Sequence, residues 1–235
     1  MSEEVEVAER GDQRRQRLSR ERVVGAALAI ADADGLGALT IRSLATELGV
    51  KPMSVYYHVA GKDDILAALV DIVFGEIVLP VPGRDWRPEM ERRADSARKV
   101  LARHRWAIGL LESRPDPGPA NLRHHDTVLA SLRAAGFSPE LTAHAYALID
   151  SYVYGFALQE ASLPFEGRES VGDVAGPIME RMAAGEYPHL AQMATTYYLQ
   201  PGYDFGDEFR FGLDLILDGL EAAVSRQGAA PRGVS

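Results

Sequence analysis

The stretch that decides the fold runs from residue 40 to residue 62 and reads TIRSLATELGVKPMSVYYHVAGK. The apolar residues of its first half recur at spacings of three and four, as on one face of a two-turn helix: Ile41, Leu44, Ala45 and Leu48. Thr40 is a good N-cap residue, and Gly49 can adopt the positive φ that ends a helix. A second short helix follows, in which Pro52 is tolerated in the first turn because no intrahelical N–H is needed there. Two short helices joined by a glycine-containing turn are typical of a helix-turn-helix unit.

The second short helix has a narrow apolar stripe, formed by Val55 and Val59. It leaves Tyr56, Tyr57 and His58 on its other faces. In a helix-turn-helix unit such side chains meet the major groove, and hydroxyl and imidazole groups also contact phosphates. The alternative is a small helical hairpin with exposed aromatic side chains, as in many helical cores. We favour DNA binding, because two tyrosines and a histidine exposed on so short a helix require a partner.

The composition excludes several classes of protein. The chain has 235 residues, of which 46% are hydrophobic, and this suffices for a buried core in one or two domains. It has no cysteine, which excludes a disulfide scaffold and a thiolate metal site. No apolar run approaches the length of a membrane span, and the acidic start MSEEVEVAER does not resemble a signal peptide. We therefore expect a cytoplasmic protein with no membrane partner.

The net charge of −9 is distributed unevenly along the chain. Residues 13–62 contain eight Lys and Arg against four acidic residues, whereas residues 1–12 contain five acidic residues and one Arg. Phosphate affinity depends on the local basic face, so the asymmetry supports one DNA-contacting end and an acidic body. Four arginines within residues 14–20 form a basic arm. That arm is either a solvated charge run or a contact to the DNA backbone or minor groove.

Helical periodicity continues through the rest of the chain, with no strand-like alternation and no internal repeat. We expect helices at about residues 19–33, 62–78, 87–111 (with an interruption at Arg103-His104), 121–135, 139–163 and 204–225. The predicted fold class is all-α. Its expected parts are a flexible arm (1–17), a helix-turn-helix DNA-binding domain (18–65), a helical ligand-binding and dimerisation domain (66–226) and a disordered tail (227–235).

The head of the chain resembles a known family. LTIRSLATELGV at residues 39–50, followed by SVYYHVAGKDDILAALVD at residues 54–71, is similar to the DNA-binding head of the tetracycline-repressor (TetR) family of bacterial regulators. The resemblance covers about residues 18–75. It implies these DNA contacts: Arg42 on the first motif helix, Pro52, Met53, Ser54, Tyr56 and His58 on the second, and Lys62 on a phosphate. Arg42 is the candidate for bidentate reading of guanine, while Pro52 and Met53 would give apolar contacts, for example with a thymine methyl group.

The body of the chain also resembles this family. The similar runs are ESRPDPGPANL, LASLRAAGFSPE and AYALIDSYVYGFALQEA, within about residues 104–163. The resemblance implies a helical body that binds a small molecule, and a homodimer joined by a four-helix bundle of the 139–163 and 204–225 helices. We expect Phe209 and Leu213 in the subunit interface, together with the surface from Tyr152 to Leu158.

The resemblance also bears on the effector. It places Leu110 and Gln159 where tetracycline-binding members hold a drug-bound Mg²⁺ through a histidine and, via water, a glutamate. Without an imidazole and a carboxylate, a magnesium–tetracycline chelate has little to hold it. We therefore expect a small, largely apolar effector with Arg114 and Tyr146 as polar anchors. The candidate pocket residues, for each of which ordinary packing is the alternative, are Leu110, Ser113, Arg114, Val128, Tyr146 and Gln159.

The alternative function is that of an all-α metal-dependent enzyme that uses the histidines of the body. His124, His125 and Asp126 suggest a metal cluster, but adjacent residues of a helix diverge by about 100°. No Ser-His-Asp, P-loop or Rossmann motif occurs in the sequence. We therefore expect no metal, no cofactor and no enzymatic activity. The expected function is a repressor that an effector releases from a palindromic operator, while an activator or a DNA-binding protein without a ligand stays open.

Overall fold

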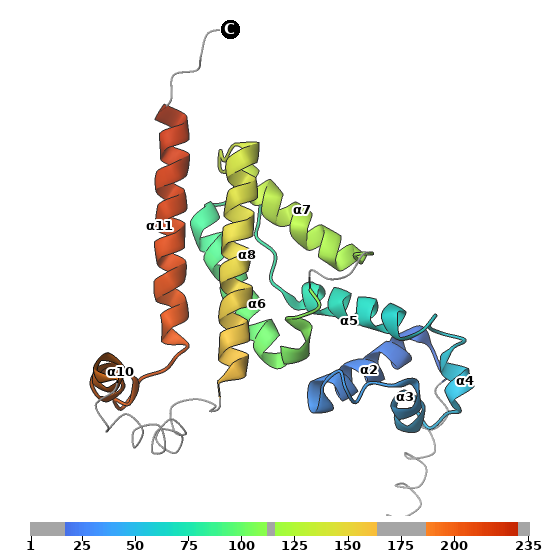
Figure 1. Cartoon of the computed structure of the whole chain (residues 1–235). Helices are drawn as coiled ribbons and strands as arrows, with labels where there is room; N and C mark the ends of the chain where they lie inside the picture. The colour runs from blue at the N-terminus through green and yellow to red at the C-terminus, as the bar shows by residue number, and fades with distance from the viewer. Residues whose placement is uncertain (1–16, 112–115, 164–186, 230–235) are drawn as a thin grey trace, which may run out of the picture. The chain divides into compact units, whose positions relative to one another are not determined.

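The computed structural model of the chain describes residues 17–111, 116–163 and 187–229. Every regular element in these ranges is a helix, which confirms the predicted all-α fold class (Figure 1). The chain divides into two compact units. The head unit contains residues 1–75 and 109–122, and the body unit contains residues 76–108 and 123–235.

In its described residues, the head unit contains α2 (Arg20–Asp34), α3 (Ile41–Glu47), α4 (Pro52–Val55) and α5 (Lys62–Glu76), whose last residue belongs to the body unit. The predicted cap at Thr40 is present. Its hydroxyl accepts the Ser43 N–H at 3.0 Å, and the Ser43 hydroxyl accepts the Thr40 N–H at 2.9 Å, so two amides at the start of α3 are satisfied reciprocally. Gly49 has a φ of 65°, as predicted for the turn between α3 and α4.

The core of the head unit draws on α2, α3, α4 and α5. Five side chains in it are fully buried: Val23, Ala27, Leu44, Val55 and Leu69. Helices as short as α3 and α4 are unstable in isolation, so this packing is what holds them in place.

The body unit contains α6 (Trp86–Arg103), most of α7 (Pro119–Ala134), α8 (Pro139–Ser162), α10 (Pro188–Met193) and α11 (Asp207–Ala229). The first four residues of α7 belong to the head unit. In the body unit α8 packs against α6 and against α11 (Figure 1). The predicted interruption at Arg103-His104 is confirmed, since α6 ends at Arg103 and His104 is its C-cap. Of the helices in the described ranges, none has the length and apolarity to cross a membrane.

One expectation about α11 is wrong. Phe209 and Leu213 are only 1% and 0% exposed in a single chain, so they do not lie on a free surface that a second subunit could cover. Tyr152 of α8 explains the burial, because its ring stacks on Phe209 at 5.5 Å and its hydroxyl donates to the Phe209 carbonyl at 2.9 Å. Helical periodicity identifies an apolar face of α11, but it does not show whether that face packs against the same chain or against a second subunit. The large apolar side chains that α11 exposes are Phe211 (66%) and Leu215 (58%).

Candidate functional site

The candidate DNA-binding surface is the outer face of α4 and of the residues that flank it. Val55 (0% exposed) and Val59 (3%) anchor this segment in the head core. Because a helix this short buries so little, most of its side chains remain outside. Met53, Tyr56 and Tyr57 are 67%, 49% and 83% exposed. Large apolar side chains on a surface usually mark an interaction site, and here they lie on the second helix of a helix-turn-helix unit or directly after it.

The structure places all seven predicted DNA-contacting residues in the head unit. Arg42 is exposed on α3, Pro52, Met53 and Tyr56 are exposed on or beside α4, Ser54 and His58 are half-buried, and Lys62 is exposed where α5 begins. The ammonium group of Lys62 donates to the Leu36 carbonyl oxygen at 3.4 Å, so its contact with a phosphate stays a prediction.

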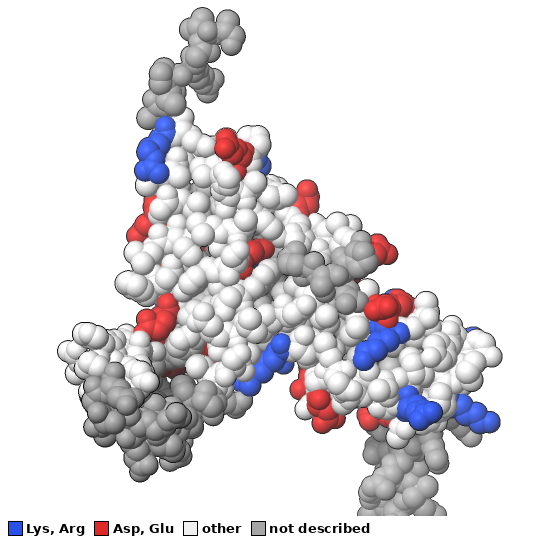
Figure 2. Space-filling view, in the orientation of Figure 1, with Lys and Arg blue, Asp and Glu red and all other residues white. Residues whose placement is uncertain are grey.

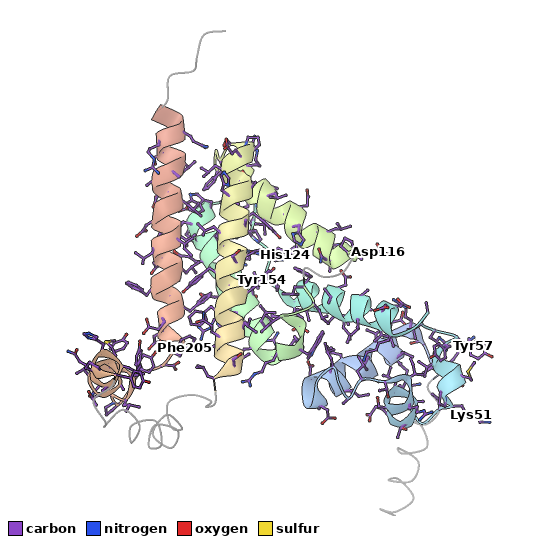
Figure 3. The ribbon with its side chains drawn as sticks, in the orientation of Figure 1. Lys51, Tyr57, Asp116, His124, Tyr154 and Phe205 are labelled. Atoms are coloured by element: carbon purple, nitrogen blue, oxygen red, sulfur yellow. The ribbon has the colours of Figure 1, made fainter. Side chains whose placement is uncertain are left out.

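The predicted DNA contacts omitted Lys51 and Tyr57, although Tyr57 was expected on the outer face of the helix and the structure exposes both side chains. Figure 3 shows them at opposite ends of the α4 segment, where both side chains point away from the head unit. Lys51 also lies outside the Val55/Val59 stripe, and this is the signal that could have found it. Lys and Arg side chains are also visible at the surface of the head unit in Figure 2.

An ion pair fixes α5 to the rest of the head unit. The guanidinium group of Arg20 in α2 donates to both carboxylate oxygens of Asp64 in α5, at 2.7 and 2.6 Å. These hydrogen bonds hold the pKa of Asp64 below its usual range. Asp64 also accepts the backbone N–H of Ala60 at 2.9 Å. The segment that follows α4 is therefore attached to α5 through Ala60.

The predicted effector-binding residues belong partly to the head unit and partly to the body unit, and two of them lie outside the described residues. Ser113 and Arg114 lie outside the described residues. Leu110 is half-buried in the head unit. In the body unit, Val128 on α7 is buried, Tyr146 on α8 is half-buried and Gln159 on α8 is exposed. The Tyr146 hydroxyl is hydrogen-bonded to Nδ1 of His125, and burial raises the pKa of Tyr146 above its ordinary value.

The sequence analysis missed a buried polar cluster in the body unit. Arg93 of α6, His124 of α7 and Asp150 of α8 are 1%, 0% and 5% exposed. Arg93 pairs with Asp150, Nη2 to Oδ1, at 2.6 Å, and its Nε donates to His124 Nε2 at 3.2 Å. Tyr154 donates to the other Asp150 oxygen at 3.4 Å (Figure 3 labels Tyr154 and His124). Among the described residues, Nη1 of Arg93 has no hydrogen-bond partner.

Burial and the neighbouring guanidinium group determine the charge of this cluster. Desolvation first, and then Arg93, lowers the pKa of His124 to about 3, so His124 is neutral at physiological pH. Arg93 and Asp150 form an ion pair at 2.6 Å, and Nη1 of the arginine has no hydrogen-bond partner among the described residues.

One signal in the sequence could have identified Arg93. It lies on the stripe formed by Trp86, Met90, Ala97 and Val100, with spacings of three and four, where a buried residue is expected. Its neighbours in ERRADSARK look like a solvated charge run, which hid it. As for the metal-enzyme alternative, the described ranges contain no group of three His, Asp or Glu side chains that could hold a metal ion.

Two family profiles match this chain. The profile described as "Bacterial regulatory proteins, tetR family" matches residues 23–69, and the one described as "Tetracyclin repressor-like, C-terminal domain" matches residues 79–224. The chain belongs to the tetR family. It is accordingly a DNA-binding, ligand-responsive transcriptional regulator.

Individual tetR-family proteins align over most of the chain. The HTH-type transcriptional repressor DrrR1 of Streptomyces coeruleorubidus is 36% identical over 220 residues, which are 89% of this chain and 80% of that protein. Tetracycline repressor protein class D of Escherichia coli is 32% identical over 89% of this chain and 92% of its own length. The structure of ActR from Streptomyces coelicolor in complex with actinorhodin has a TM-score of 0.71 and 28% identity, and covers 89% of this chain and 99% of ActR. These relatives are named as regulators, which fits a protein that is not an enzyme and gives no support to the metal-dependent alternative.

Proposed function

We propose that this tetR-family regulator is a cytoplasmic repressor. It binds a palindromic operator as a homodimer and leaves it when a small, largely apolar molecule binds the body unit. The observation that carries the DNA-binding part is the outer face of α4, where Met53, Tyr56 and Tyr57 are exposed while Val55 alone fixes the helix. Arg42 reads a base from α3, and Lys51 and Lys62 contact phosphates.

The proposed dimer uses the outer faces of α8 and α11. Both helices are long, with 24 and 23 residues, and both expose large apolar side chains. Leu148 and Leu158 on α8 are 47% and 55% exposed, and Phe211 and Leu215 on α11 are 66% and 58% exposed. Two copies of this pair would form a four-helix bundle with a two-fold axis. The same two-fold axis would relate the head units of the two subunits, so the operator should be palindromic.

The proposed effector site includes the Arg93–His124–Asp150 cluster. A buried ion pair seldom adds net stability over apolar side chains of similar volume, so its presence in a core favours a specific role. The unpartnered Nη1 of Arg93 would donate to an oxygen of the effector, and Val128 and Tyr146 would cover an apolar part of it. Arg114 remains a proposed second anchor. ActR was solved with actinorhodin, and a TetR variant from Acinetobacter baumannii with minocycline, which supports a polycyclic molecule with ketone or phenol oxygens.

The proposed response is a shift between two states. The effector favours a body conformation in which α5 holds the two heads at a separation that does not match successive major grooves. Leu110 and Gln159 stand at the positions where tetracycline-binding members have a histidine and a glutamate, so no ligand for magnesium is expected there. Tetracycline with magnesium should therefore neither raise the melting temperature of the protein nor release it from the operator.

The test is the selection of DNA fragments by the purified chain, followed by binding assays on the enriched fragment. A palindromic fragment is expected. Arg42→Ala should relax the preference at one base of each half-site, by about 1–3 kcal/mol, whereas Arg226→Ala removes an exposed arginine of α11 and should leave the preference unchanged. Stoichiometric bound metal and no salt-dependent DNA binding would instead favour the enzyme.

A further inference from the structure

The helix α7 begins without a capping side chain of its own. The residue before the helix is Gly118, which has no side chain, and its carbonyl accepts the Leu122 N–H at 3.0 Å. The first N–H groups of a helix have no intrahelical acceptor. Pro119 has no N–H, so two amides of this turn, those of Ala120 and Asn121, require an outside partner.

Asp71 of α5 supplies that partner. Its Oδ1 accepts the N–H of Ala120 and the N–H of Asn121, both at 2.9 Å, across 49 and 50 residues of sequence. The close approach depends on Gly118, because a Cβ at that position would lie 2.3 Å from the Asp71 Cγ. We call this contact the Asp71–α7 cap. All of its atoms belong to the head unit, although α7 continues into the body unit.

Near its N-terminal end, α5 also contacts the segment that follows α4, the second helix of the helix-turn-helix unit. Asp64 precedes Asp71 by seven residues, which places both on one face of α5. Asp64 accepts the Ala60 N–H just after α4, and it pairs with Arg20 of α2. Near Asp71 the packing is open, since a groove of about 650 Å³ is lined by α2, α5 and residues 116–119. Two hydrogen bonds of one carboxylate therefore make the connection from α5 to the first turn of α7.

We propose that the Asp71–α7 cap is the coupling contact that transmits the state of α7 to the DNA-binding head, with Asp71 as its positioning residue. This inference rests on the proposed function, because α7 also supplies His124 and Val128 to the effector site. A shift of α7 relative to α5 would leave two amides without an acceptor, so the cap would be either made or broken. Coupling is reciprocal, so DNA bound at α4 must in turn stabilise α7.

This reciprocity allows a test that needs no effector. The probe is the DNA fragment enriched by the wild-type chain, and the measurement is amide hydrogen exchange of residues 123–134 with and without that fragment. In the wild type, DNA should slow the exchange at least about fivefold, the lower end of typical coupling. The slowing should fall below about twofold in Asp71→Ala, which removes the acceptor, and in Gly118→Ala, which displaces the carboxylate but keeps its charge.

Two controls separate coupling from charge and from stability. Asp71→Asn keeps an oxygen acceptor of the same shape and should retain the slowing. Asp63→Ala removes an exposed carboxylate from the same helix and should also retain it. If Asp71→Ala fails to fold, Gly118→Ala provides the same comparison.

The outcomes are distinct. Equal slowing in the wild type and both cap variants, or no slowing in a wild type that binds the fragment, overturns the inference and leaves the proposed function intact. If the wild type enriches no fragment at all, the proposed function falls and the inference falls with it.

Discussion

The Arg93–Asp150 pair allows a prediction whose size follows from its burial. Asp150→Leu leaves the guanidinium group of Arg93 in a site that is 1% exposed, with its anionic partner at 2.6 Å removed. Breaking a buried pair by removing one partner costs about 3–5 kcal/mol. For a chain of this size, 1 kcal/mol changes the melting temperature by about 2–4 °C, so the expected loss is about 6–20 °C. Replacing both partners, with Arg93→Met and Asp150→Leu together, should restore most of the stability, because no charge is then buried alone.

The assay is thermal unfolding followed by circular dichroism, at one protein concentration because a dimer melts in a concentration-dependent way. Glu140→Leu is the matched control. It removes a carboxylate that is 86% exposed and 3.7 Å from His144 on the same helix, and should change stability by no more than about 0.5 kcal/mol. The reasoning is refuted if Asp150→Leu melts like the wild type, or if the double variant is as unstable as the single one.

Three further predictions concern reading, assembly and pH. Tyr57→Ala removes a side chain that is 83% exposed, so the stability should change by less than about 0.5 kcal/mol. Fluorescence anisotropy should nevertheless show weaker operator binding. Unchanged affinity would mean that Tyr57 is not part of the DNA-binding surface. Phe211→Asp should give a folded monomer in sedimentation experiments. Leu213→Asp places a charge at a site that is 0% exposed and should instead lower the melting temperature. A dimeric Phe211→Asp variant would contradict the proposed interface. The folded pKa of His124, about 3, lies below the ordinary 6.5, so only the unfolded state takes up this proton as the pH falls from 6.5 toward 3. Stability should then drop by up to about 1.4 kcal/mol per pH unit in urea titrations, and the slope should shrink in His124→Gln.

The head could be predicted from the sequence because its determinants are local. The Thr40 hydroxyl reaches an amide three residues away, and Gly49 ends α3 through its own φ of 65°. Rules of short range suffice for such features. The burial of Val55 and Val59 also follows from their spacing, and that burial fixes which side chains of α4 face outward.

Features that depend on distant partners could not be predicted in this way. The cap of α7 comes from Asp71, and no local pattern connects that residue with Gly118. Arg93 lies in a run of charges, and only the packing of α7 and α8 against α6 shows that its side chain is buried. The partner of Phe209 was misassigned for the same reason, since an apolar face packs equally well against its own chain or another.

The small contribution of α4 to the core has a consequence for how such a regulator diversifies. Only Val55 of this helix is buried, so the exposed side chains at 51–53 and 56–57 are almost independent of the fold. Substitutions there should be nearly neutral for stability, and each can change a contact with a base. New operator preferences are therefore accessible by single steps through folded intermediates. A saturation library at Met53, Tyr56 and Tyr57 should consist mostly of well-expressed proteins with different target sequences.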